Sequence, residues 1–261
     1  MGAWRHRLAL SAAAVTARQV GRVDDEAALR DAVLLTRPGD FLSAGPAGLL
    51  LFARRRLVAR PAEDLLTEKS LAAVAEEFGY APDNDALGDL ADDLRKLGAG
   101  AGMVATLTGA FIAAEQYGFG RAVGAWLADA LLAQRLGWPH AVPLLGSEVA
   151  LNINAGRSRR SATASPVEPD KPATDRTKSL LAAQARAALR AIDLSAELGR
   201  RADRLLAVAP QLRAKAADAI VASEKIAGMS DRGLRRLFDR LVELGAVREL
   251  SGRPTFRVYG L

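Results

Sequence analysis

The residues best suited to binding chemistry are arginines gathered in the C-terminal part of the chain. They recur at helical spacing after a serine, and an arginine side chain can donate to guanine N7 and O6 or bind a backbone phosphate. The candidate DNA-binding residues are Ser230, Arg232, Arg235, Arg236, Arg240, Arg248, Arg253 and Arg257. This set predicts double-stranded DNA as the partner.

The positive net charge is concentrated in the same C-terminal part of the chain. The 261-residue chain carries a net charge of +6, but residues 1–150 carry −3 and residues 180–261 carry +6. Such an asymmetry indicates a polyanionic partner for the basic part. The alternative is that arginine is a favoured surface residue in an arginine-rich composition.

A second cluster could serve an enzyme, since Asp129 and His140 can transfer protons and Trp138 can form the wall of a pocket. Against this, the sequence has no glycine-rich phosphate loop followed by Lys-Ser/Thr. Asp129 can instead pair with a neighbouring arginine such as Arg121, and the prolines that flank His140 can simply stiffen a helix exit. An enzyme is therefore the least favoured class.

The composition excludes several kinds of site. With no cysteine, the chain has no disulfide, thiolate zinc site, iron–sulfur cluster or cysteine nucleophile. Residues 63–93 contain ten acidic residues against one lysine, but Leu87 replaces a required oxygen ligand and the closing Glu of a calcium loop is missing. We interpret Asp89, Asp92 and Asp93 as a solvated helix face. No metal, cofactor or catalytic residue is expected.

The elements that must position these residues are helices, because Ala, Leu and Arg dominate the sequence and favour helix. Helical periodicity predicts helices over residues 3–20, 46–57, 71–78, 99–114 and 121–136, and another that Asp24 caps. The basic and apolar start is read as a core helix, with a targeting segment as the alternative. Residues 97–114 are uncharged, but their four glycines indicate a buried helix, so no membrane is expected and the cytoplasm is the predicted location.

The C-terminal part predicts a winged helix-turn-helix. Helices are expected near residues 212–221 and 223–227, and a third helix begins after Ser230 and ends before Gly245. Two short strands, 247–250 and 255–259, then flank a turn and form a hairpin. The alternative for the third helix is that Asp239 and Glu243 neutralise its arginines along the helix.

The predicted fold is mainly α, with a multi-helix N-terminal domain before the winged helix-turn-helix. Residues 1–150 form the helical domain, residues 151–178 a flexible linker or exposed loop, and residues 179–261 a long helix plus the winged helix, whose core is 212–261. The helical domain could act as a sensor or form a homodimer.

Four segments resemble an uncharacterised bacterial family, domain of unknown function 1403 (DUF1403). They read GAWRHRLAL, DEAALRDA, GAWLADALLAQRLGWPHAVPLL and MSDRGLRRLFDRLVELGAVRELSGRPTFRVYGL. The resemblance implies no activity or catalytic residue. It implies that members extend upstream of the Trp4 helix, so we expect the chain to be short at its N-terminus.

Two functions follow as hypotheses. The first is a DNA-binding, regulatory protein that reads duplex DNA through the winged helix. The second is a protein-interaction module, in which the winged helix packs on the helical domain and the acidic residues 63–93 face Arg235 and Arg236.

Overall fold

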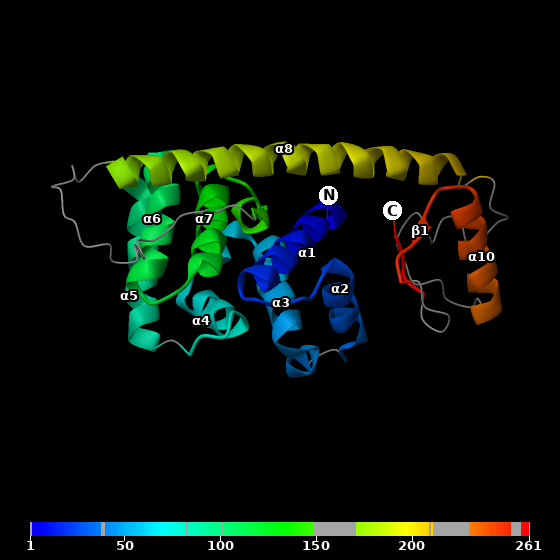
Figure 1. Ribbon diagram of the computed structural model, residues 1–261, viewed down its shortest axis with the longest axis horizontal. Coiled ribbons are helices and arrows are strands. Elements are labelled where there is room, and N and C mark those ends of the chain that lie inside the picture. The colour runs from blue at the N-terminus through cyan, green and yellow to red at the C-terminus, as the bar shows by residue number, and fades with distance from the viewer. Residues whose placement is uncertain are drawn as a thin grey trace, which may run out of the picture. The chain divides into compact units, whose positions relative to one another are not determined.

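The structure is a computed structural model, and it is mainly α-helical, as predicted (Figure 1). It describes residues 2–37, 40–81, 83–100, 102–148, 171–208, 210, 230–251 and 257–260. The helices are α1 (Gly2–Gln19), α2 (Glu26–Leu35), α3 (Gly45–Ala59), α4 (Glu68–Glu77), α5 (Asn84–Gly100), α6 (Met103–Gln116), α7 (Arg121–Arg135), α8 (Lys171–Val208) and α10 (Asp231–Glu243). Short 3-10 helices are η1 (Phe41–Ala44), η2 (Ala62–Asp64) and η3 (Leu145–Ser147), and the strands are β1 (Arg248–Glu249) and β2 (Tyr259–Gly260).

The chain divides into two compact units. The first unit is Met1–Ala191 and the second unit is Ile192–Leu261. The division falls within α8, whereas the sequence placed the start of the C-terminal domain at residue 179. Most of the predicted linker lies outside the described residues, and α8 begins at Lys171, where the sequence predicted a start near Ser179.

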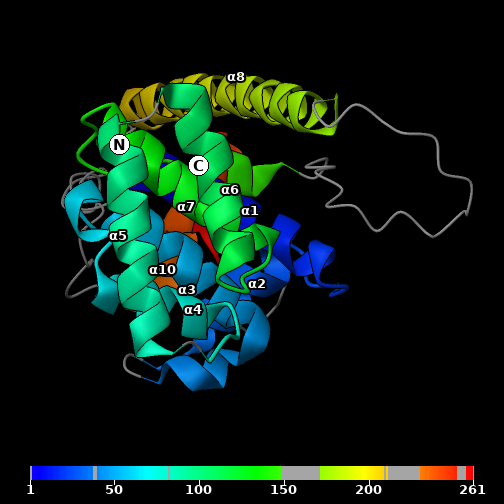
Figure 2. The ribbon, with the colours of Figure 1, turned by 90° about the vertical axis from the view of Figure 1, so that its left-hand side faces the viewer.

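In the first unit, helices pack closely because small residues line their contacts. Helix α1 packs against α3 and η3, and five of its eight buried residues are alanines. These alanines, each at most 1% exposed, are Ala9, Ala12, Ala13, Ala14 and Ala17. Gly124 serves the same purpose between α6 and α7, since a Cβ there would stand 2.7 Å from the ring of Phe111. Figure 2 shows α5, α6 and α7 as neighbouring rods.

Two predicted helix boundaries are corrected. The N-cap of α2 is Asp25, whose Oδ1 accepts from the N–H of Ala28 at 2.8 Å, while Asp24 pairs with Arg22. The uncharged stretch is not one helix, because α5 continues to Gly100 and Gly102 is the N-cap of α6. Within the described ranges, no helix is both long and apolar enough to cross a membrane.

Two neighbouring acidic residues of α5 form local ion pairs on its surface. Asp92 pairs with Arg95 and Asp93 with Lys96, each three residues further along the helix. This is the solvated helix face that the sequence predicts. Among the residues that the structure describes, no group of three His, Asp or Glu side chains could hold a metal ion.

The first part of α8 runs across the ends of α6 and α7 (Figure 1), and both apolar and charged contacts fix it to the rest of the first unit. One stripe of it is buried: Leu180, Ala183, Ala187 and Ala191. The indole Nε1 of Trp4 donates to the carbonyl of Ala191 at 2.7 Å. Arg186 and Arg190 both pair with Glu148, whose side chain is only 3% exposed. The buried carboxylate therefore anchors two consecutive turns of α8.

Replacing Glu148 with alanine should loosen this part of α8. The change removes a buried acceptor of charged hydrogen bonds, which contribute about 1.5–3 kcal/mol each, and Arg186 and Arg190 would turn to solvent. Amide exchange over residues 180–191 should therefore accelerate. The control is Glu115→Ala, which removes a longer, more exposed contact with Arg176 at 3.7 Å. Equal exchange in the two variants would contradict the anchoring role.

Candidate functional site

The arginine-bearing helix α10 begins and ends where the sequence predicts. The hydroxyl of Ser230 accepts from the N–H of Gly233 at 3.2 Å, which satisfies one of the free donors of the first turn. Gly245 follows the helix with a φ of 66°, a conformation that glycine adopts without steric cost. Ser230, a candidate DNA contact, thus caps the helix with its hydroxyl.

The apolar face of α10 holds the second unit together. Leu241 is completely buried and packs with Val208 of α8 and Ala246. Phe238 stacks on Tyr259 of β2, with ring centroids 4.5 Å apart. β2 pairs antiparallel with β1, so the chain returns to α10 as the predicted hairpin requires. The helix is therefore fixed on one side and presents the other.

The exposed side of α10 carries positive charge that the helix does not neutralise. Arg232, Arg235 and Arg236 are exposed and have no ion-pair partner among the residues that the structure describes. The acidic residues of the helix pair elsewhere: Glu243 with Arg240 at 2.9 Å, and Asp239 with Arg257 at 3.3 Å. The sequence offered the alternative that Asp239 and Glu243 neutralise the arginines of their own helix. Among the described residues, only the pair of Arg240 with Glu243 is of this kind. Within that part of the chain, the first two turns keep three guanidinium groups available.

The structure places the remaining candidate DNA-binding residues in different surroundings. Arg248 lies exposed on β1. Arg257 contacts Asp239 and also approaches Glu249 at 3.9 Å, so it links the hairpin to α10. Arg253 lies outside the described residues, as do the predicted helices 212–221 and 223–227. Of the predicted winged helix, the structure describes the third helix, α10, and the two paired strands. The other predicted parts lie on residues that it does not describe.

The three exposed arginines of α10 are suited to binding anionic groups. Three guanidinium groups on consecutive turns present planar, always charged donors, which suit phosphate oxygens and the acceptor edge of guanine. They lie at the N-terminal end of α10, where a recognition helix makes its base contacts. The face can therefore hold a polyanion, and among its described residues we find no arrangement that would perform a reaction.

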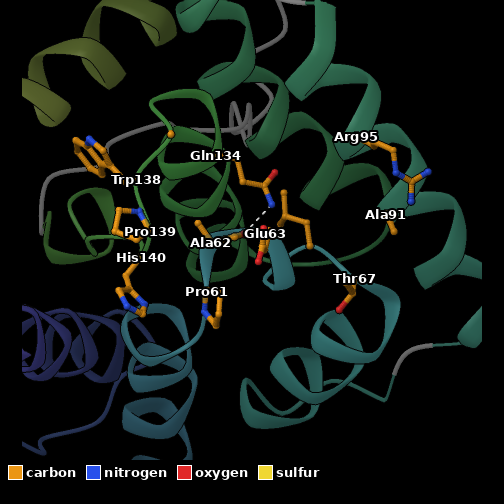
Figure 3. A pocket seen from close by; sticks show the side chains of 12 residues that line it. Pro61, Ala62, Glu63, Thr67, Ala91, Arg95, Gln134, Trp138, Pro139 and His140 are labelled. Carbon is orange, nitrogen blue, oxygen red and sulfur yellow. Dashed lines mark hydrogen bonds between the residues drawn. The ribbon is translucent and has the colours of Figure 1, made fainter.

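The three residues considered for an enzyme do not form one site. Trp138 and His140 line the same pocket of the first unit (Figure 3), but Asp129 is not among its lining residues. Asp129 is buried, and its carboxylate accepts from the N–H groups of Leu145 and Gly146 at 3.0 and 3.3 Å. It holds η3 on α7 and is not placed to act on a ligand in that pocket.

The charge that acts on Asp129 is that of Arg54 on α3, a residue that no sequence pattern singles out. Burial raises the pKa of Asp129 to about 7, although the amide hydrogen bonds and Arg54 lower it in part. Burial also lowers the pKa of Arg54 to about 10, and Asp129 opposes this shift. Three consecutive arginines stand at residues 54–56, and nothing in their order indicates which one is buried.

Arg54 lies at the centre of the first unit, with only 1% of its surface exposed. Its Nη2 donates to the hydroxyl of Thr16 at 3.0 Å and to the carbonyl of Ala122 at 3.2 Å. The guanidinium also lies 5.3 Å from the ring centroid of Phe78, and it packs so closely on Gly146 that a Cβ there would be 2.5 Å from Nη1. This cluster is structural.

Comparison with known proteins gives one match. The model of the family described as "Protein of unknown function (DUF1403)" matches residues 1–261. No curated protein and no solved structure matches the chain.

Proposed function

We propose that this chain, which belongs to the DUF1403 family, binds double-stranded DNA through the exposed face of α10. The observation that carries the proposal is the group of three exposed arginines, Arg232, Arg235 and Arg236, which have no ion-pair partner within the described part of the chain. Because α10 is anchored by its opposite face, these side chains are presented on a fixed helix, as direct contact with a groove requires.

The surroundings of α10 support the same function. The hairpin packs against the helix through Phe238 and Tyr259, and Arg248 adds an exposed cation on β1. A helix in the major groove flanked by a basic hairpin is the arrangement of a winged helix. The basicity of residues 180–261 supplies the long-range attraction to phosphate that brings such a surface to DNA.

The proposed role is regulatory, with the helical first unit as the part that senses a signal or forms a dimer. Because a regulator that binds DNA must share a compartment with it, we propose that the protein is cytoplasmic. Sedimentation of the free protein and of its complex would distinguish a monomer from a homodimer.

The Arg235→Ala/Arg236→Ala variant should bind duplex DNA about tenfold more weakly than the unaltered chain at low salt, because it loses two cations that can neutralise phosphates, and phosphate contacts supply the affinity for a random sequence. Fluorescence anisotropy with a labelled random-sequence duplex, at about 50 and about 200 mM salt, measures this effect. Affinity of the unaltered chain should fall steeply with salt. The slope should become shallower in the variant by about one unit for each phosphate that the variant no longer binds.

The matched control is Arg18→Ala/Arg37→Ala, which removes the same charge from two exposed positions of the first unit. If both double variants lose affinity equally, binding reflects net charge and not the α10 face. If the folded, unaltered chain does not bind at low salt, the DNA proposal is wrong. The C-terminal part would then be better explained as a protein-docking element.

A further inference from the structure

A pocket of about 770 Å³ opens on the first unit, well away in sequence from the arginines of α10. Its walls come from the end of α7 and the loop after it, from η2 and the start of α4, and from α5. In Figure 3, Trp138, Pro139 and His140 stand on one side and Thr67 and Arg95 on the other, with Glu63 and Gln134 between them. Its volume suits a small organic molecule.

The walls are held together by hydrogen bonds to the backbone. The N–H of Ala62 donates to the carbonyl of Pro139 at 3.0 Å, and Gln134 Nε2 donates to the carbonyl of Ala62 at 2.8 Å. The N–H of Trp138 donates to the carbonyl of Ala133 at 2.9 Å. The pocket is thus formed before any ligand binds, which reduces the entropy cost of binding.

Trp138 differs from the other two tryptophans. The indole groups of Trp4 and Trp126 donate to the carbonyls of Ala191 and Ala53. The half-buried Trp138 has no such acceptor for Nε1 within the described part of the chain. Because Trp138 lines the pocket, a ligand there can contact its indole, and an aromatic face attracts cations.

Polar atoms around the pocket are mainly acceptors. His140 Nδ1 lies 3.0 Å from the carbonyl of Arg60, which can only accept, so Nδ1 of the neutral ring carries the proton and Nε2 keeps a lone pair. Gln134 donates from its amino group to Ala62, and its Oε1 remains an acceptor. Glu63 is exposed and has no ion-pair partner among the described residues.

Charge around the pocket also favours a cation. Arg95, the basic side chain in the wall, is paired with Asp92 at 2.6 Å. Among the lining residues, the carboxylate is that of Glu63, and it has no ion-pair partner within the described part of the chain. Because Arg95 is paired and Glu63 is not, the free charge of the lining is negative and favours a cation over an anion.

We propose that this pocket binds a primary amine with an apolar body, as a ligand site separate from the DNA-binding face. The ammonium group contacts the carboxylate of Glu63 and can donate to the remaining acceptors. The apolar body lies on the indole of Trp138 and on the proline rings beside it. The proposal does not depend on DNA binding.

The test uses phenethylamine as the probe, with 2-phenylethanol as its neutral counterpart and 3-phenylpropionate as the anionic one. Calorimetry should show saturable binding of the amine with a Kd below about 1 mM, and markedly weaker binding of the other two. Glu63→Gln should weaken amine binding at least tenfold, about 1.4 kcal/mol. In a ¹H–¹⁵N spectrum, the amine should shift the indole signal that Trp138→Phe removes, and leave those of Trp4 and Trp126.

Glu76→Gln is the control, since it removes the same charge from the acidic segment at a residue outside the pocket. It should leave the Kd within twofold. The proposal is overturned if the amine does not saturate, if 3-phenylpropionate binds as well, or if the Glu63 and Glu76 variants behave alike. Each of these results leaves the DNA-binding proposal untouched.

Discussion

The Arg54→Ala variant should lose about 3–5 kcal/mol of the free energy of unfolding of the first unit, the usual cost of breaking a buried charge arrangement from one side. The substitution removes the bond to Thr16 and the contact with Phe78, and it takes away the cation that acts on the buried Asp129. It also opens a cavity where the longest side chain of the cluster lay.

Urea unfolding followed by tryptophan fluorescence measures this loss. All three tryptophans, Trp4, Trp126 and Trp138, lie in the first unit, so the signal reports that unit alone. Arg54→Met, which keeps most of the volume, separates the lost charge from the cavity. Arg60→Ala, an exposed arginine next to the same helix, should change the free energy by no more than about 0.5 kcal/mol. A similarly small effect of Arg54→Ala would contradict its central role.

The stability of the first unit should fall as pH rises from about 5 to about 7, by up to about 1.4 kcal/mol per pH unit from Asp129 alone. The pKa of Asp129 is about 7 in the folded chain, against an ordinary value of 3.8. Between these two values the folded chain keeps a proton that the unfolded chain releases. Deprotonation of Asp129 therefore favours the unfolded state. Its contribution to stability is complete below pH about 4 and is lost as the pH rises to about 7.

Asp129→Asn should remove this slope, because the amide does not titrate. The variant should also be less stable at pH about 5, since the amide nitrogen would face the N–H of Leu145 or Gly146, and two donors cannot bond. Chemical unfolding of both proteins across this pH range gives the two slopes. His6, whose pKa is lowered by burial, makes stability rise with pH in the same range, but it does so equally in both proteins. A wild-type slope no more negative than that of Asp129→Asn would therefore contradict the raised pKa of Asp129.

Local signals in the sequence predicted α10 well. A serine, an acidic residue and a closing glycine mark both of its ends, and the apolar stripe with Leu241 identifies the buried face. The same kind of signal was less exact at Asp24 and Asp25, where two adjacent carboxylates are equally good caps and only the turn geometry selects one. Gly102 shows a further limit, because an uncharged run gives no indication of where one helix stops and the next begins.

Long-range contacts could not be predicted. Arg54, Arg55 and Arg56 are chemically identical, and which of them is buried depends on how α3 packs against α1 and its other neighbours. The sequence suggested Trp138 and His140 as pocket residues, with a stiffened helix exit as the alternative, and the structure places both in one pocket. Glu63 could not be added to them, because the loop and η2 meet only through the hydrogen bonds of the folded chain.

The buried alanines of α1 restrict which substitutions this helix can accept. Where helices approach over a methyl group, almost any other side chain is too large, and overpacking costs about 1–3 kcal/mol for each misfit. At a contact lined by leucine, another apolar side chain of similar volume can take its place. At a contact lined by alanine, only glycine and serine are small enough to replace it. The buried alanine positions of α1 therefore tolerate few substitutions, whereas exposed positions such as Ala3 and Arg18 can change with little effect on packing.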